Sequence, residues 1–107
     1  MISIERMEMA LKYLAETDDK FAYHKAHAAR TEHKAKAIKQ AVFLRCDGTV
    51  AERTAKAEDS DEYKAAMDNY FEALREAEHV KNKRATESIV IEVWRSLNSS
   101  RNKGNIV

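Results

Sequence analysis

The sequence predicts an all-α protein built around a long antiparallel helical hairpin, similar to a coiled coil, with a short helix at the bend. Proline is absent from the 107 residues and glycine occurs only at positions 48 and 104, whereas Ala, Glu, Lys, Leu and Arg dominate. This composition is typical of long helices. A heptad spacing and charge blocks of alternating sign support the same fold class. Because two helices make a thin core, we also expect self-association into a bundle.

The first helix is expected over residues 4–45, where nothing interrupts it. Apolar, small and weakly polar residues recur there at alternating spacings of three and four, the pattern of a coiled-coil seam. These seam residues are Met7, Ala10, Leu14, Thr17, Phe21, His24, Ala28, Thr31, Ala35, Ile38 and Val42. In an alternative interpretation, Thr17 and the two aspartates after it cap a second helix and separate a short N-terminal one.

The bend is expected directly after the first helix. Gly48 favours a helix end, because glycine readily adopts the left-handed conformation found beyond helix C-termini. Thr49 and Glu52 follow with the spacing of a capping box, in which each side chain satisfies a backbone N–H of the first turn. This pattern predicts a short helix over residues 50–57.

A last long helix is expected over residues 61–97, with Asp59 or Ser60 as its cap and acidic residues in its first turn. The polar residues 98–107 are expected to form a flexible tail. Residues 1–97 would then form a single domain, which suits a chain of this length.

Folding the chain back at the bend brings the long helices together. Apolar residues should meet at both ends of the hairpin: Ile38 and Val42 against residues 63–74, and residues 7–14 against residues 89–97. The middle of the first helix is rich in alanine, which permits close approach but buries little apolar area. We therefore expect weak packing in the middle of the hairpin.

The charge pattern favours the same antiparallel pairing. The net charge is −3 over residues 1–19, +6 over 20–45, −6 over 46–79 and +4 over 80–107. Each block faces a block of opposite sign when the chain folds back. Single exposed ion pairs contribute only about 0 to 1 kcal/mol, but the alternation of sign disfavours parallel and misregistered pairings.

Catalysis and a metal site are both disfavoured. Cys46 is the only thiol, and the chain contains no Gly-x-Ser-x-Gly motif or phosphate-binding glycine loop. The pairs His24 with His27 and Glu76 with His79 resemble half of a di-iron motif, but the first helix lacks the glutamates that such a site needs. We therefore expect no enzyme activity, no metal and no cofactor.

Two groups of basic residues differ in their expected role. The basic residues of 20–45 face the acidic block, so we expect them to form a solvated, paired surface. The second group has fewer opposing acids and is the candidate contact for nucleic acid or an acidic partner. It contains Lys81, Lys83, Arg84, Arg95, Arg101 and Lys103.

An apolar group in the last helix is the candidate self-association surface. It contains Ile89, Val90, Val93, Trp94 and Leu97. Trp94 has a second interpretation, as a core residue at helical spacing from its apolar neighbours. No segment approaches the roughly 18 apolar residues of a membrane span, so we expect no membrane contact. We also expect no small-molecule substrate and a location in the host cytosol.

The segments GTVAERTAKAEDSDEYKAAMDNYFEAL and IVIEVWRSLNSSRNK resemble a small helical protein of temperate proteobacterial phages. Such proteins are often encoded near recombination genes, so the resemblance implies an accessory role in DNA metabolism but assigns no functional residue. Our first hypothesis is therefore a non-catalytic phage accessory protein that binds DNA or a DNA-processing protein through its basic C-terminal arm. The alternative is a structural or regulatory protein-protein adaptor, or an inhibitor of a host protein, without nucleic-acid contact.

Overall fold

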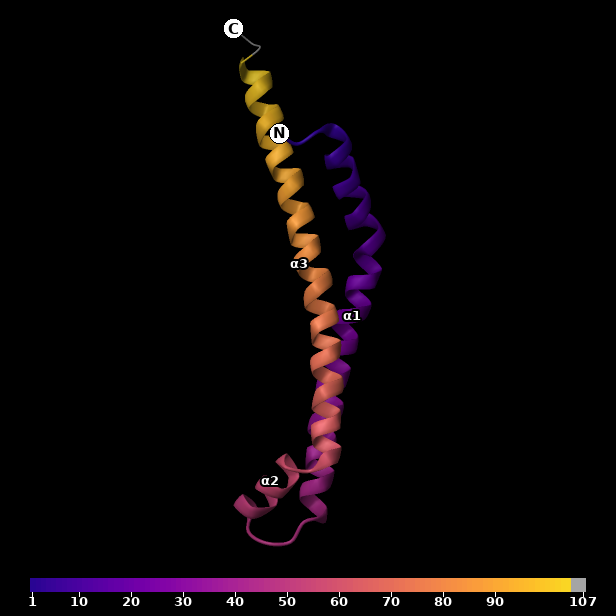
Figure 1. Cartoon of the computed structure of the whole chain (residues 1–107), viewed down its shortest axis with the longest axis vertical. Helices are drawn as coiled ribbons and strands as arrows, with labels where there is room; N and C mark the ends of the chain where they lie inside the picture. The colour runs from indigo at the N-terminus through magenta and orange to yellow at the C-terminus, as the bar shows by residue number, and fades with distance from the viewer. Residues whose placement is uncertain (105–107) are drawn as a thin grey trace. The chain divides into compact units, whose positions relative to one another are not determined.

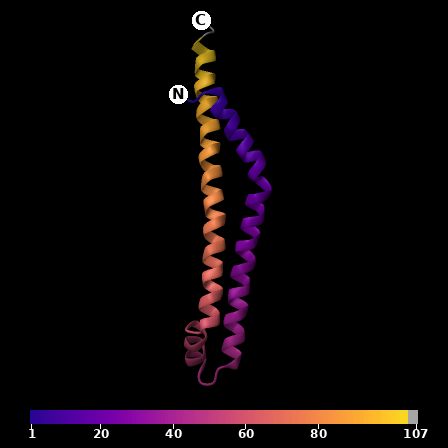
Figure 2. The same cartoon turned by 45° about the vertical axis from the view of Figure 1, so that its right-hand side comes forward.

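The computed structural model describes the backbone of residues 1–104 and the side chains of residues 1–101. All regular structure in this part of the chain is helical: α1 covers Ile4–Arg45, α2 covers Val50–Glu58 and α3 covers Asp61–Gly104. Figures 1 and 2 show the short α2 between the end of α1 and the start of α3. Because α3 returns antiparallel to α1, the predicted all-α helical hairpin with a short helix at the bend is confirmed.

Helix α1 is continuous over 42 residues. It starts after Ser3, whose hydroxyl accepts a hydrogen bond from the backbone N–H of Arg6 at 3.1 Å and so satisfies one donor of the first turn. Thr17 does not interrupt the helix. Its hydroxyl donates to the carbonyl of Tyr13 at 2.7 Å, a bond to the preceding turn that leaves the helical backbone intact. The alternative of a split first helix is therefore wrong.

The bend follows the predicted chemistry. Gly48 has a positive φ of 116°, and a Cβ at this position would lie 2.6 Å from a carboxylate oxygen of Glu52. Only glycine therefore fits this conformation without strain. The Thr49 hydroxyl accepts from the backbone N–H of Glu52 at 3.1 Å, which confirms Thr49 as the cap of α2.

Helix α3 starts where the sequence predicts it and extends further. Of the two candidate caps, Ser60 fills the role, since its hydroxyl accepts from the backbone N–H of Tyr63 at 3.3 Å. The expected end at Leu97 is wrong, because α3 is described through Gly104. The polar residues after Leu97 include no proline, and glycine appears first at position 104, so nothing breaks the helix earlier. Residues 105–107 of the expected tail lie outside the described residues.

The contacts of the chain divide it into two units, which we describe separately. Unit 1 contains residues 1–21 together with residues 78–107, and unit 2 contains residues 22–77. Unit 1 consists of the N-terminal half of α1 and the C-terminal part of α3, whereas unit 2 contains the remaining segments of both helices and the whole of α2.

The predicted seam of α1 is confirmed. All eleven of its heptad positions are buried or half-buried, five in unit 1 and six in unit 2. In unit 2 the seam is built from small side chains, with a cluster of Ala28, Ala73 and Ala77 at its centre. Among the described residues no large side chain is fully buried, so the core is thin, as the alanine content predicts.

Helix α3 carries a matching seam that its apolar residues alone do not reveal. Buried or half-buried residues recur along it at strict spacings of three and four. They are Tyr63, Ala66, Tyr70, Ala73 and Ala77 in unit 2, and Val80, Arg84, Glu87, Ile91, Trp94 and Asn98 in unit 1. The expected apolar contact between residues 7–14 and residues 89–97 is correct only in part, because Leu11, Ile89, Val93 and Leu97 are all exposed.

Candidate functional site

In unit 1, α3 has a second distinctive face besides its seam. We call it the outer face and define it by six exposed residues at spacings of three or four: Asn82, Thr86, Ile89, Val93, Leu97 and Ser100. Most of them follow a seam residue by two positions, as Val93 follows Ile91. At 3.6 residues per turn this offset rotates a side chain by about 200°, to the side opposite the seam. The outer face is therefore a solvent-facing stripe without a single charged residue.

Three aliphatic side chains form the centre of the outer face. Ile89 is 62% exposed, and Val93 and Leu97 are each 41% exposed. The solvent face of a helix is normally charged or polar, and 35% of this chain consists of charged residues. An uncharged, aliphatic stripe on such a helix is a candidate interaction surface.

In unit 2, the corresponding exposed stripe of α3 has the charged composition that is usual for the solvent face of a helix. Its exposed positions there are Asp61, Lys64, Asp68, Phe71 and Arg75. Ion pairs cover this surface: Lys64 lies 2.9 Å from Asp59 and Arg75 lies 2.6 Å from Glu72. The next exposed position along the stripe, Glu78 at the start of unit 1, is also charged. The uncharged part therefore begins at Asn82, within unit 1.

The predicted self-association residues divide between two faces. Ile89, Val93 and Leu97 belong to the outer face, whereas Val90 is half-buried beside it. Trp94 lies in the seam and, together with Leu97, lines a surface hollow of about 380 Å³ that the N-terminal residues 1–4 also border. Trp94 thus serves packing within unit 1.

The seam of unit 1 contains an arginine. The Arg84 guanidinium donates to the Leu14 carbonyl at 2.8 Å, to the Thr17 hydroxyl at 2.7 Å and to Asp18 at 3.3 Å. It also lies 5.6 Å from the ring centroid of Phe21, and its side chain is only 19% exposed. These contacts use three of the five N–H donors of the Arg84 guanidinium within the chain. They tie α3 to α1 in one register.

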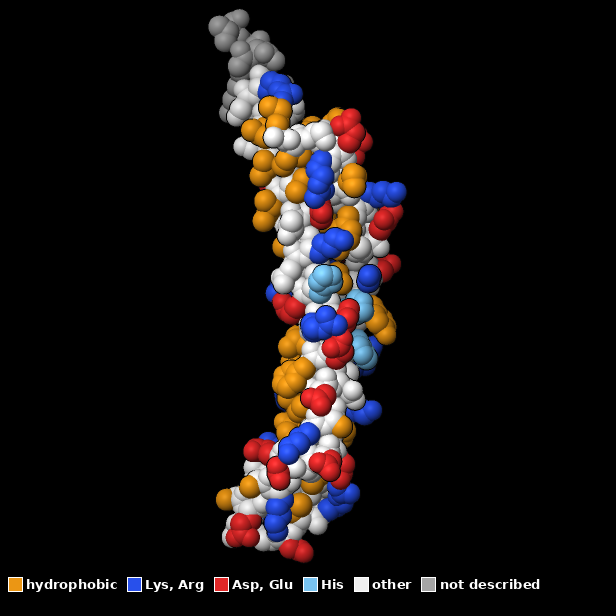
Figure 3. All heavy atoms as spheres, in the orientation of Figure 1, with side chains coloured by type: hydrophobic (Ala, Val, Ile, Leu, Met, Phe, Trp, Pro, Cys, Tyr) orange, Lys and Arg blue, Asp and Glu red, His pale blue; other side chains and the backbone are white. Residues whose placement is uncertain are grey.

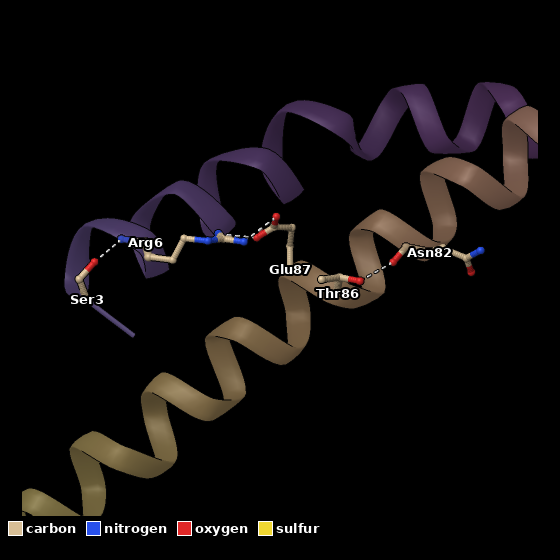
Figure 4. Close-up of polar contacts among 5 residues, drawn as sticks. All are labelled: Ser3, Arg6, Asn82, Thr86 and Glu87. Atoms are coloured by element: carbon tan, nitrogen blue, oxygen red, sulfur yellow. Dashed lines mark hydrogen bonds and ion pairs between the residues drawn. The ribbon is translucent and has the colours of Figure 1, made fainter. Parts of the chain in front are cut away.

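A second polar contact crosses the seam of unit 1. Arg6 of α1 donates to both carboxylate oxygens of Glu87 on α3, at 2.6 and 2.9 Å. Figure 4 shows Glu87 pointing toward Arg6 from the facing helix. The hydrogen bonds from Arg6 lower the pKa of Glu87, whose side chain is only 12% exposed. The pair is bidentate, a geometry that adds orientation to the charge attraction.

The other predicted contact residues of the basic C-terminal arm are dispersed. Lys83 lies 4.8 Å from the ring centroid of Tyr13, Arg95 is paired with Glu92 at 3.0 Å, and Arg101 donates to the Met1 sulfur at 3.4 Å. Helical spacing places Lys83 and Arg101 on one flank of the seam and Arg95 on the other. Lys81 is exposed, and the side chain of Lys103 lies outside the described residues.

The basic residues of the first helix are partly paired, as expected. In unit 2, Lys36 contacts Glu32 and Lys39 contacts Glu58, at 3.1 and 2.9 Å. Arg45 pairs with Glu62. On the face that Figure 3 draws, lysine and arginine side chains are interspersed with aspartate and glutamate.

In unit 2, His24 and His27 border a groove of about 640 Å³ that Ala65, Ala66 and Ala73 also line. His24 and His27 contact the Tyr23 ring, with centroid distances of 5.4 and 5.9 Å. Glu76 borders the same groove, whereas His79 is an exposed residue of unit 1. Within the described residues, no group of three or more His, Cys, Asp or Glu side chains is arranged to hold a metal ion.

Comparisons with protein-family models, with curated proteins and with solved structures find no match for this chain. The resemblance to small phage proteins therefore stays a prediction. No described helix combines the length and the apolar character needed to span a membrane.

Sequence reasoning found the aliphatic residues of the outer face but not the face itself. It grouped Ile89, Val93 and Leu97 with the seam residue Trp94, because all are apolar and close in sequence. The missing signal was a second heptad register, offset by two residues from the seam, in which charge is absent. Counting charges along that register separates the two faces.

Proposed function

We propose that the chain is a non-catalytic protein-interaction module that binds another helix through the outer face of α3. The observation that carries this proposal is the stripe of six uncharged, exposed residues that forms the outer face, with Ile89, Val93 and Leu97 at its centre. Aliphatic side chains at these spacings are the anchors by which helices pack against one another. Contact with a partner would remove them from water.

Site-specific photo-crosslinking tests this function. A photoreactive amino acid replaces Val93 in one variant and Phe71 in the control, and both variants are expressed in cells. Both positions are exposed on α3, but the stripe around Phe71 is charged. We expect a discrete adduct with a protein at position 93 and none at position 71. Equal adduct yields at the two positions, or none at either, would overturn the proposal.

The contact of the basic C-terminal arm with DNA stays a second hypothesis. Its support is the net charge of +4 over residues 80–107, and its weakness is that Arg84 is committed to contacts within the chain. Electrostatic binding would weaken steeply with salt. A gel-shift experiment at low salt that compares the native chain with Lys81→Glu should show reduced binding in the variant, whereas no complex with the native chain would remove this hypothesis.

A further inference from the structure

We infer that the outer face of α3 binds the outer face of α3 in a second copy of this chain. The two helices run antiparallel, and the twofold axis lies at Val93. This inference rests on the proposed function and names its partner. The resulting interface would join two α3 helices, while each α3 keeps its seam with its own α1.

The outer face is nearly symmetric about Val93. Ile89 and Leu97 lie four positions to either side of it, and Thr86 and Ser100 lie seven positions to either side. In an antiparallel pair, Ile89 of one copy therefore meets Leu97 of the other, and Thr86 meets Ser100. A twofold interface requires this kind of self-complementarity, because the same patch forms both sides.

The surface area of the chain leaves room for such an interface. A compact protein of 12.3 kDa exposes about 6,100 Å², whereas this chain exposes 7815 Å². The excess of about 1,700 Å² is about twice the roughly 800 Å² that each partner buries in a standard protein-protein interface. The outer face spans about 28 Å of helix, enough for an extended helix-helix contact.

Disulfide trapping tests both the partner and the orientation. Cys46→Ser provides a background without thiols, and single cysteines are then placed at Val93, Ile89, Leu97 or Phe71. Under mild oxidation we expect the Val93→Cys chain to form a covalent dimer at least tenfold faster than the Phe71→Cys control. A mixture of Ile89→Cys and Leu97→Cys chains should crosslink faster than either alone, because only the mixed pair meets in the antiparallel register.

Sedimentation of the native chain provides the independent measurement. We expect a mass of twice 12.3 kDa at high concentration, and dissociation upon dilution. The inference is overturned if the mass stays that of one chain, if Val93→Cys dimerises no faster than the control, or if Ile89→Cys crosslinks to itself as fast as in the mixture. A monomer whose position 93 crosslinks in cells to a different protein would overturn the second copy as partner and leave the proposed function intact.

Discussion

The two units use helix α3 in opposite ways. In unit 2 the seam contains alanines and tyrosines and the opposite stripe is charged, which is the usual arrangement of an amphipathic helix. In unit 1 the seam contains Arg84 and Glu87, whereas the outer face is uncharged and aliphatic at its centre. We propose that a helix that directs charged side chains to the facing helix and apolar ones to solvent makes a second contact. The comparison is therefore the reason for proposing the interaction surface in unit 1.

The seams also differ in what holds the helices together. Ala28, Ala73 and Ala77 of unit 2 provide close approach with little apolar area. The ion pairs of Lys39 with Glu58 and of Arg45 with Glu62, which also join segments of unit 2, are largely exposed. Among its residues with described side chains, unit 1 has only two that are buried, Ala10 and Val80, but it has two arginine contacts that specify one register. Packing of small residues stabilises unit 2, and directional polar contacts align unit 1.

The largest expected effect comes from a charge placed in the alanine seam. Ala73 is 6% exposed, so Ala73→Asp buries a carboxylate among apolar side chains without a partner. We expect a loss of about 3 kcal/mol or more in the free energy of unfolding, measured by urea denaturation. The matched control is Phe71→Asp on the exposed stripe of the same helix. If both variants lose the same stability, the seam assignment in unit 2 is wrong.

The next effect concerns the register of unit 1. Arg84→Met keeps the length of the side chain but removes its hydrogen bonds to Leu14, Thr17 and Asp18. We expect a loss of about 1 to 3 kcal/mol, with faster amide hydrogen exchange confined to residues 1–21 and 78–104. Lys81→Met, at an exposed position on the same helix, should change little. Faster exchange in unit 2 instead would contradict the separate roles of the two seams.

A smaller effect is expected for the outer face. Val93→Glu should leave the helical content unchanged, because the residue is solvent-facing in the single chain. It should raise the dissociation constant of the dimer at least tenfold, or about 1.4 kcal/mol, since a twofold axis brings both glutamates together. Analytical ultracentrifugation measures the change, with Val50→Glu on the exposed surface of α2 as the control. An unchanged dissociation constant would exclude this face from the interface.

The smallest effect is a pH dependence. Hydrogen bonds from Arg6 hold the pKa of Glu87 below its ordinary value of 4.5. A carboxyl with a lowered pKa in the folded state stabilises that state above its ordinary pKa, and this contribution is lost as the pH falls through the folded-state pKa. As the pH falls from about 6 to about 3, the free energy of unfolding of the Glu87→Gln variant should therefore decrease less than that of the native chain. Thermal melts across this range would reveal the difference, and identical slopes would argue against the pair.

Much of the fold follows from local chemistry that the sequence displays openly. Gly48, the Thr49 cap and Ser60 mark the helix boundaries, and the heptad of α1 predicts its seam. The seam of α3 could not be found in the same way, because Arg84 and Glu87 occupy it. Whether a charged residue lies in a seam depends on its partners, here Thr17 and Arg6 on a distant part of the chain.

The candidate site was predictable only as a group of aliphatic residues. Which of them face solvent depends on where the seam lies, and Trp94 and Val93 differ by one position but belong to different faces. The nucleic-acid prediction depended on a sum of charges. That sum contains no information on which basic side chains, such as Arg84 and Arg95, are already paired within the chain.

The most direct test of this account compares thiol reactivity at equivalent exposed positions of the two units. Val93→Cys and Phe71→Cys are each placed in a Cys46→Ser chain, and their reaction with a maleimide is followed as the protein concentration rises. We predict that the cysteine at position 93 becomes at least tenfold less reactive with concentration while the one at position 71 does not change. Equal rates at both positions at every concentration would contradict the claim that the outer face of α3 is covered by a second chain.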